Sequence, residues 1–136
     1  YKVSLAIPIY NVSLFVERAL LSVLNQTYDN IEYLIVDDKG QDDSMDIVHR
    51  IIKDHPRGKD VRIIEHPYNI GLGATRNTAI DNAQGEYLFF MDSDDEIIPT
   101  CIEILVHKMQ EHPVDFIAAS HMKKDLSGKT YPTYYV

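Results

Sequence analysis

The sequence predicts an α/β fold in which a mainly parallel sheet is covered by helices on both faces. Apolar segments with strand character alternate along the chain with segments whose apolar residues recur at helical spacing. Strict alternation of strands and helices favours parallel strands joined by right-handed crossovers. The chain has 136 residues, of which 45% are hydrophobic, and this suffices for one hydrophobic core. We therefore expect a single domain over residues 1–136.

Each element of this fold has its own local signal. Oily or β-branched runs predict strands at 3–9, 31–36, 61–64, 86–91 and 115–120. Apolar residues at helical spacing predict helices at about 15–24, from about 44, at 74–84 and after Pro99. Ser13 is the expected N-cap of the first helix, and Gly85 is the expected C-terminal stop of the third. Thr100 and Glu103 have the spacing of a capping box at the start of the last helix.

Composition and charge argue against several classes of protein. The formal net charge is -8 and the pI is about 5.1, whereas nucleic acids and anionic membranes are usually bound through a basic surface. No apolar stretch approaches the roughly 18 residues of a membrane span, and no signal peptide is visible. The single cysteine, Cys101, excludes an internal disulfide and fits a reducing compartment. We expect a soluble chain that binds no nucleic acid.

Three carboxylates follow the fourth predicted strand directly. Tyr87–Met91 is apolar enough to lie inside a sheet, and it runs into Asp92, Asp94 and Asp95. In an extended chain residues i and i+2 point the same way, so Asp92 and Asp94 can present oxygens to one side, as a hard divalent cation requires. The alternative is an Asp-rich turn that caps the helix near Pro99.

Polar residues also follow the other three major strands. The carboxyl ends of parallel strands meet at one edge of a sheet, where ligands bind in α/β proteins. We therefore expect these polar groups to converge on one crevice. Each also has a simpler explanation: Asn11 can shape a turn, Asp37 and Asp38 can cap a helix, and Arg76 can pair with a nearby acid.

The motifs at these positions resemble those of family 2 glycosyltransferases. Their order and spacing match over about the first 105 residues. This resemblance implies a Rossmann-like GT-A fold, a nucleotide-sugar donor, a divalent metal, and transfer of the sugar with inversion to a hydroxyl of a saccharide or lipid-linked acceptor. The motifs are Pro8-Ile-Tyr-Asn11, Ser22-Val-Leu-Asn-Gln-Thr-Tyr28, Leu34-Ile-Val-Asp-Asp38, Asn69-Ile-Gly-Leu-Gly-Ala-Thr-Arg-Asn77, Gly85-Glu-Tyr-Leu-Phe-Phe-Met-Asp-Ser-Asp-Asp95 and Pro99.

The resemblance implies roles for individual nucleotide-binding residues. The backbone around Pro8 and the side chain of Tyr10 would line the base pocket, and Asp38 would accept a hydrogen bond from the base, usually uracil. Arg76 would lie beside the nucleotide. The turn at Gly71 would let the main chain pass close to the ligand, since glycine has no side chain to hold it off.

The resemblance also implies a metal site. Asp92 would lie near the ribose and the water shell of the metal, and Asp94 would coordinate Mn²⁺ or Mg²⁺ directly, with Asp95 as the second choice. A divalent cation stabilises the negative charge that develops on a departing diphosphate. Oxygen ligands suit these hard cations, and the sequence shows no Cys or His cluster with zinc spacing.

A general base for the acceptor is the missing part. In the resembled family this carboxylate comes from a later segment, and no matching motif follows the metal motif here; His121 and Asp125 are candidate substitutes, more simply read as loop residues. We expect the donor-binding portion of a longer transferase, truncated before its acceptor-binding half, and located in the cytoplasm or at the inner membrane face. A non-catalytic nucleotide-sugar binding module is the main alternative.

Two other classes share single features with this chain. Gly71-x-Gly73-x-x-Arg76 lacks the last glycine of a dinucleotide fingerprint, which argues against an NAD-dependent oxidoreductase. A phospho-receiver domain would carry its acid pair after the first strand rather than the second. The glycine that usually follows the paired acids of the resembled family stands one position later here, at Gly40, and we expect Lys39 to form a surface ion pair rather than a phosphate contact.

Overall fold

A computed structural model of the chain describes residues 1–113, 121–124 and 130–133. The chain divides into two compact units, Tyr1–Glu103 and Ile104–Val136. The second unit contains most of helix α4 (Cys101–Glu111) and an antiparallel hairpin of β5 (His121–Lys124) and β6 (Thr130–Thr133). The strand predicted at 115–120 lies outside the described residues. Every candidate site residue named above, His121 and Asp125 excepted, lies in the first unit.

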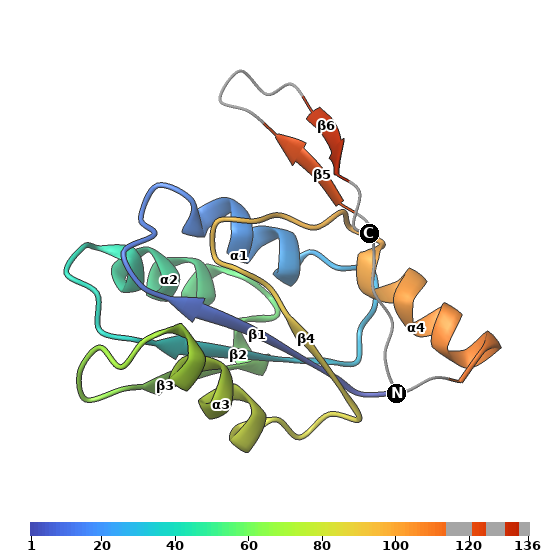
Figure 1. Cartoon of the computed structure of the whole chain (residues 1–136), viewed down its shortest axis with the longest axis horizontal. Helices are drawn as coiled ribbons and strands as arrows, with labels where there is room; N and C mark the ends of the chain where they lie inside the picture. The colour runs from blue at the N-terminus through green and yellow to red at the C-terminus, as the bar shows by residue number, and fades with distance from the viewer. Residues whose placement is uncertain (114–120, 125–129, 134–136) are drawn as a thin grey trace. The chain divides into compact units, whose positions relative to one another are not determined.

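The first unit is built on a parallel sheet of four strands in the order β3-β2-β1-β4, which confirms the predicted architecture (Figure 1). The last residue of β1 pairs with the last residue of β2, which pairs with the last residue of β3, so three strand ends are level. The strand order reverses between β1 and β4, and ligands bind beyond such a reversal. The strands are β1 (Val3–Ile9), β2 (Ile31–Asp37), β3 (Val61–Glu65) and β4 (Tyr87–Phe90).

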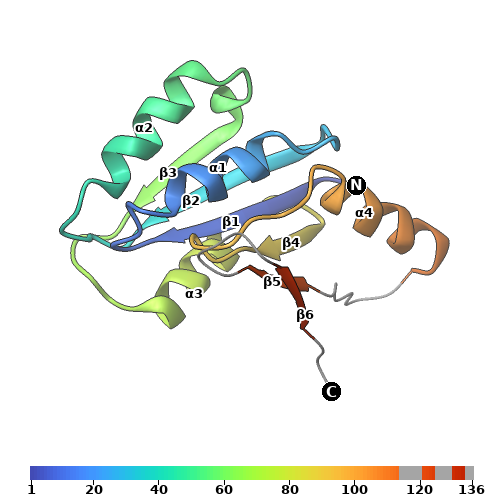
Figure 2. The same ribbon diagram turned by 90° about the horizontal axis from the view of Figure 1, so that it is seen from above.

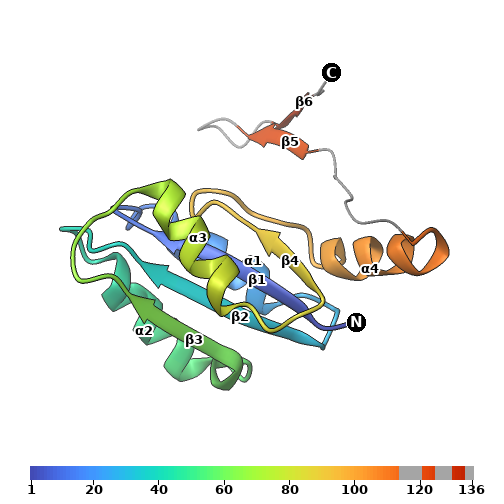
Figure 3. The same cartoon turned by 60° about the horizontal axis from the view of Figure 1, so that its bottom comes forward.

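Helices cover both faces of this sheet, as expected from the sequence. Figure 3 shows α3 on one face and α1 and α2 on the other, and Figure 2 gives the same arrangement from above. A short 3₁₀ helix, Gly58–Asp60, precedes β3. The helices are α1 (Val16–Leu24), α2 (Ser44–Asp54) and α3 (Leu72–Asn82).

The core depends on small residues where α3 meets the sheet. Ala79 of α3 packs in a buried cluster with Ala6, Leu34 and Val36 of the two central strands. Alanines on both sides of this contact let the helix approach the strands closely. All seven residues of β2 are buried, as expected for a central strand with helices on both faces.

Two local predictions were wrong, and both residues instead make contacts with parts of the chain distant in sequence. Helix α1 starts at Val16 without a side-chain cap, and the amide of Ser13 donates to Oδ2 of Asp42 (3.0 Å). Helix α3 ends at Asn82, before Gly85. Gly85 instead lies against β1, where a Cβ atom would stand 2.7 Å from the backbone nitrogen of Ser4. It is needed for close approach of two backbones rather than for a helix end.

Candidate functional site

The three acids after β4 are gathered by a turn. The amide of Asp95 donates to the carbonyl oxygen of Asp92 (3.1 Å), so this segment is not the extended chain that the sequence suggested. One carboxylate oxygen of each of Asp92, Asp94 and Asp95 lies within 4.8 Å of the others, and all three residues are exposed. Helix α4 does not begin until Cys101, so the acids do not cap it. Three converging carboxylates fit a hard cation such as Mg²⁺ or Mn²⁺.

A basic residue lies beside this turn. Nη2 of Arg76, in α3, lies 3.9 Å from Oδ1 of Asp92, and both side chains are about half exposed. A small pocket is lined by residues of β1, β2, α3 and β4, among them Pro8, Arg76 and Phe90. Three residues predicted from separate motifs, Pro8, Arg76 and Asp92, therefore meet where β1 and β4 end.

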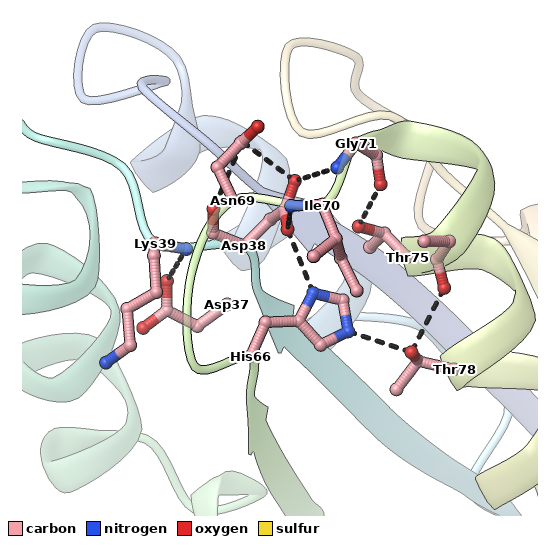
Figure 4. A network of polar contacts seen from close by, with 10 residues as sticks. Asp37, Asp38, Lys39, His66, Asn69, Ile70, Gly71, Thr75 and Thr78 are labelled. Carbon is pink, nitrogen blue, oxygen red and sulfur yellow. Dashed lines mark hydrogen bonds and ion pairs between the residues drawn. The ribbon is translucent and has the colours of Figure 1, made fainter.

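Asp38 is placed differently from the other acids, because it is buried and only 3% exposed. It follows β2, and its carboxylate faces the loop between β3 and α3 (Figure 4). An ionised carboxylate offers about four lone-pair sites, and four donors occupy them here. Oδ1 accepts from Nδ1 of His66 (2.9 Å) and the amide of Ile70 (2.9 Å), and Oδ2 accepts from Nδ2 of Asn69 (3.0 Å) and the amide of Gly71 (3.0 Å).

These contacts determine the charge of Asp38. Burial alone raises the pKa of a carboxyl group, but hydrogen bonds from Ile70, His66 and Gly71 stabilise its ionised form. Together they hold the pKa of Asp38 below its ordinary value. Asp38 is therefore a fixed anion that organises the loop around it, and it does not cap α2.

Gly71 connects this network to α3. Its φ of +95° and ψ of 168° belong to a region that is essentially restricted to glycine. Its amide reaches Asp38, while its carbonyl oxygen accepts hydrogen bonds from the amide (3.1 Å) and hydroxyl (2.7 Å) of Thr75. Thr75 and Arg76 both line the pocket with Pro8. The turn at Gly71 therefore connects the hydrogen-bond network of Asp38 with this pocket.

Tyr10 lies at the end of β1 with its side chain exposed. The next residue, Asn11, has a positive φ of 50°, and its Oδ1 accepts a hydrogen bond from the amide of Gln41 (2.7 Å). The amide of Asp38 donates to the carbonyl oxygen of Ile9 (3.0 Å), so Tyr10 and Asp38 leave neighbouring strands side by side. Asn11 thus shapes a turn, while Tyr10 is available to a ligand.

The expectation for Lys39 is confirmed. Its Nζ lies 3.3 Å from Oε2 of Glu65, and both side chains are exposed. Its backbone amide donates to Oδ1 of Asp37 (2.9 Å), which turns the chain directly after β2. Lys39 therefore forms a surface ion pair across two strand ends.

Sequence reasoning assigned His66 no role, and the structure places it at the centre of the Asp38 network. The residue directly follows β3, at the same strand-end position as the other site residues. That position was the signal that could have identified it. His121 lies in β5, but its side chain and the whole of Asp125 lie outside the described residues.

Comparison with known proteins identifies the family. A model of glycosyl transferase family 2 matches residues 4–135. The chain belongs to this family. The members of this family are sugar-transferring enzymes, and the resemblance noted in the motifs is thereby confirmed.

Several curated relatives of this glycosyltransferase chain come from bacteria. An uncharacterized glycosyltransferase of Haemophilus influenzae is 34% identical over 93% of the chain, which covers 49% of that relative. A Campylobacter jejuni protein named GalNAc(5)-diNAcBac-PP-undecaprenol beta-1,3-glucosyltransferase is 31% identical, with 94% of the chain covering 43% of it. The chain thus spans less than half the length of these relatives.

Solved structures confirm the GT-A fold. TarS 1-349 of S. aureus in complex with UDP has a TM-score of 0.74 and 28% identity, with 82% of this chain covering 33% of that chain. The mannosyltransferase PcManGT from Pyrobaculum calidifontis, in complex with GDP-Man and Mn²⁺, has a TM-score of 0.65 and 27% identity, with coverages of 71% and 29%. Among the described residues of the present chain, none of the helices is both long and apolar enough to span a membrane.

Proposed function

We propose that this chain is the donor-binding portion of a metal-dependent glycosyltransferase that transfers a sugar from a UDP-sugar to an acceptor hydroxyl with inversion. The observation that carries the proposal is the meeting of Arg76 with the Asp92–Asp95 turn beside Pro8, at the point where the strand order reverses. Cationic and anionic groups side by side suit a ligand that is itself an anion with a bound cation.

The nucleotide would lie along the ends of β1 and β2. Tyr10 is exposed and can stack on a base, while Pro8 and Gly71 would bring the main chain close to the ligand. Arg76 would pair with a phosphate, which its half-exposed guanidinium can reach. We retain Asp38 as a residue of the base pocket. Because four donors of the protein already occupy its carboxylate, it would act on the base through the loop that it holds rather than by the predicted hydrogen bond from the base.

The acidic turn would hold the metal. Asp94 would bind it directly and Asp92 would bind it on the ribose side, with Asp95 next to them. A bound Mn²⁺ or Mg²⁺ would supply charge stabilisation for the departing diphosphate. Arg76 would hold the same phosphates from the α3 side. It would also keep Asp92 oriented between its own guanidinium and the metal.

The acceptor side is proposed to lie beyond this chain. The curated relatives are at least about twice as long as the part that this chain matches, which leaves room for a general base elsewhere. A relative whose name refers to undecaprenol supports a lipid-linked saccharide as acceptor, and with it a cytoplasmic location at the inner membrane face.

Titration calorimetry tests this proposal. UDP should bind in the presence of Mn²⁺ or Mg²⁺, and Asp94→Ala should abolish that binding without unfolding the chain. Asp46→Asn is the control, because Asp46 is an exposed acid on α2, away from the turn. Binding of UDP that needs no metal, or that survives in Asp94→Ala, would contradict the metal site. GDP and CDP in the same titration identify the preferred base.

A further inference from the structure

His66 is a buried polar side chain that the proposed function does not use. Its side chain is 6% exposed, and both ring nitrogens have partners. Nδ1 lies 2.9 Å from Oδ1 of Asp38, and Nε2 lies 2.8 Å from the hydroxyl oxygen of Thr78 in α3. The ring therefore bridges the end of β2 and the middle of α3 (Figure 4).

The proton on Nδ1 can be assigned from its partner. A carboxylate only accepts hydrogen bonds, and four donors surround that of Asp38. Nδ1 must therefore carry a hydrogen and donate it. Because the ring is fixed on its other side by Thr78, this donor approaches Asp38 from a constant direction.

The orientation of Asp38 in turn determines the turn at 69–71. Its two oxygens hold the amides of Ile70 and Gly71, and Gly71 holds Thr75, the neighbour of Arg76. If the carboxylate rotates, those amides lose their acceptors and the start of α3 is released. A path of direct contacts thus runs from His66 to the α3 side of the proposed donor site.

We propose that His66 is a positioning residue, which locks the Asp38 carboxylate and thereby holds the 69–71 turn and Arg76 in place for the donor. The role of this turn in donor binding rests on the proposed function; the link from His66 to the turn does not. The side chain of His66 is buried and both of its ring nitrogens have partners within the protein, so it would act through Asp38.

Two substitutions of His66 test the hydrogen bonds of its two ring nitrogens separately. In His66→Asn the amide nitrogen can occupy the place of Nδ1 and keep the bond to Asp38, whereas in His66→Gln it can occupy the place of Nε2 and keep only the bond to Thr78. His66→Gln should weaken UDP binding about tenfold, as expected for the loss of one hydrogen bond to a charged group, while His66→Asn should stay within about threefold of the unmodified chain.

Amide hydrogen exchange provides a readout that needs no ligand. In His66→Gln the amides of Ile70 and Gly71 should exchange faster, and in His66→Asn they should remain protected. An unmodified chain that binds no UDP contradicts the proposed function, and the exchange rates then still test the link from His66 to the turn.

The inference is overturned if the two variants behave alike in both measurements. It is also overturned if His66→Gln speeds exchange but binds UDP as tightly as the unmodified chain, which would leave His66 a purely structural role. Should His66→Gln not fold, ¹H–¹⁵N correlation spectra of the unmodified chain decide, because a ring protonated only on Nε2 cannot donate to Asp38.

Discussion

The guanidinium of Arg76 and the carboxylate of Asp92 lie side by side, with 3.9 Å between Nη2 and Oδ1, although they come from α3 and from the turn after β4. Exposed ion pairs of this kind contribute about 0–1 kcal/mol to stability. Because the pair contributes so little to folding, its side chains can bind a ligand without a large loss of stability.

Arg76→Gln should therefore lower the affinity for UDP about tenfold or more while changing the free energy of unfolding by less than about 1 kcal/mol. The matched control is Arg50→Gln, which removes an exposed ion pair to Glu17 (3.7 Å) away from the site. Calorimetry and urea denaturation measure the two quantities. Equal UDP affinity in both variants would exclude a role for Arg76 in binding.

Asp38 should give the chain a measurable acid sensitivity. Its pKa is lowered in the folded state, so at low pH the unfolded chain binds more protons than the folded one. The stability that it contributes is complete above the unfolded pKa of about 3.9 and is lost as the pH falls through the folded pKa.

Asp38→Asn should cost about 2–4 kcal/mol at pH 7, because it leaves buried donors without an ionised acceptor. The difference in unfolding free energy between the two chains should shrink as the pH falls below about 4. Urea denaturation at several pH values measures it. Glu32 and Asp42 also have lowered pKa values. Their effect on the pH dependence of stability is the same in both chains and cancels in the difference. If the difference in unfolding free energy between the two chains stays constant with pH, the lowered pKa of Asp38 is contradicted.

Gly71 and Gly73 form a natural pair for substitution, since a Cβ atom at either position would meet nothing within 4 Å. Gly71→Ala should destabilise the chain by about 1–3 kcal/mol, because only its backbone angles exclude a side chain. Gly73→Ala lies inside the first turn of α3 and should stabilise it by roughly 0.4–1 kcal/mol. Thermal unfolding measures both, and the same sign for both variants would argue against the backbone assigned to Gly71.

Gly85→Ala should destabilise the chain for a different reason. A Cβ atom there would stand 2.7 Å from the carbonyl oxygen of Lys2 and from the amide nitrogen of Ser4, so β1 and the start of β4 would have to separate. We expect a loss of about 1–3 kcal/mol in unfolding free energy, typical of overpacking. Gly73→Ala again serves as the control. A loss below about 0.5 kcal/mol would mean that the strands shift without cost.

The sequence predicted the architecture and the convergence of several candidate residues because both depend on regular patterns. Alternation of strand and helix periods is sufficient for a parallel sheet, and parallel strands bring their carboxyl ends together. Pro8, Arg76 and Asp92 could therefore be assigned to one edge of the sheet from the order of the residues alone. The family resemblance added a proposed role for each residue.

At Ser13, Gly85 and His66 the observed contacts are ones that no local pattern encodes. Ser13 has the right residue type for an N-cap, but helix α1 starts only at Val16, and the amide of Ser13 donates to Asp42 in the loop before α2. Gly85 has the right type for a helix end, but its surroundings are set by β1. His66 was passed over because a lone histidine carries no pattern, and its two partners become visible only when β2 and α3 are placed together.

The pairing of β1 with β4 has a consequence for how the protein is made. Strand β1 can pair along its second edge only after β4 has emerged from the ribosome, because Ala6 pairs there with Phe90. Until then the nascent chain carries an apolar central strand with one open edge, and such edges readily pair with other chains. Pairing with β4 therefore both completes the crevice and covers the open edge of the seven-residue β1, and it leaves the shorter, four-residue β4 at the edge of the sheet.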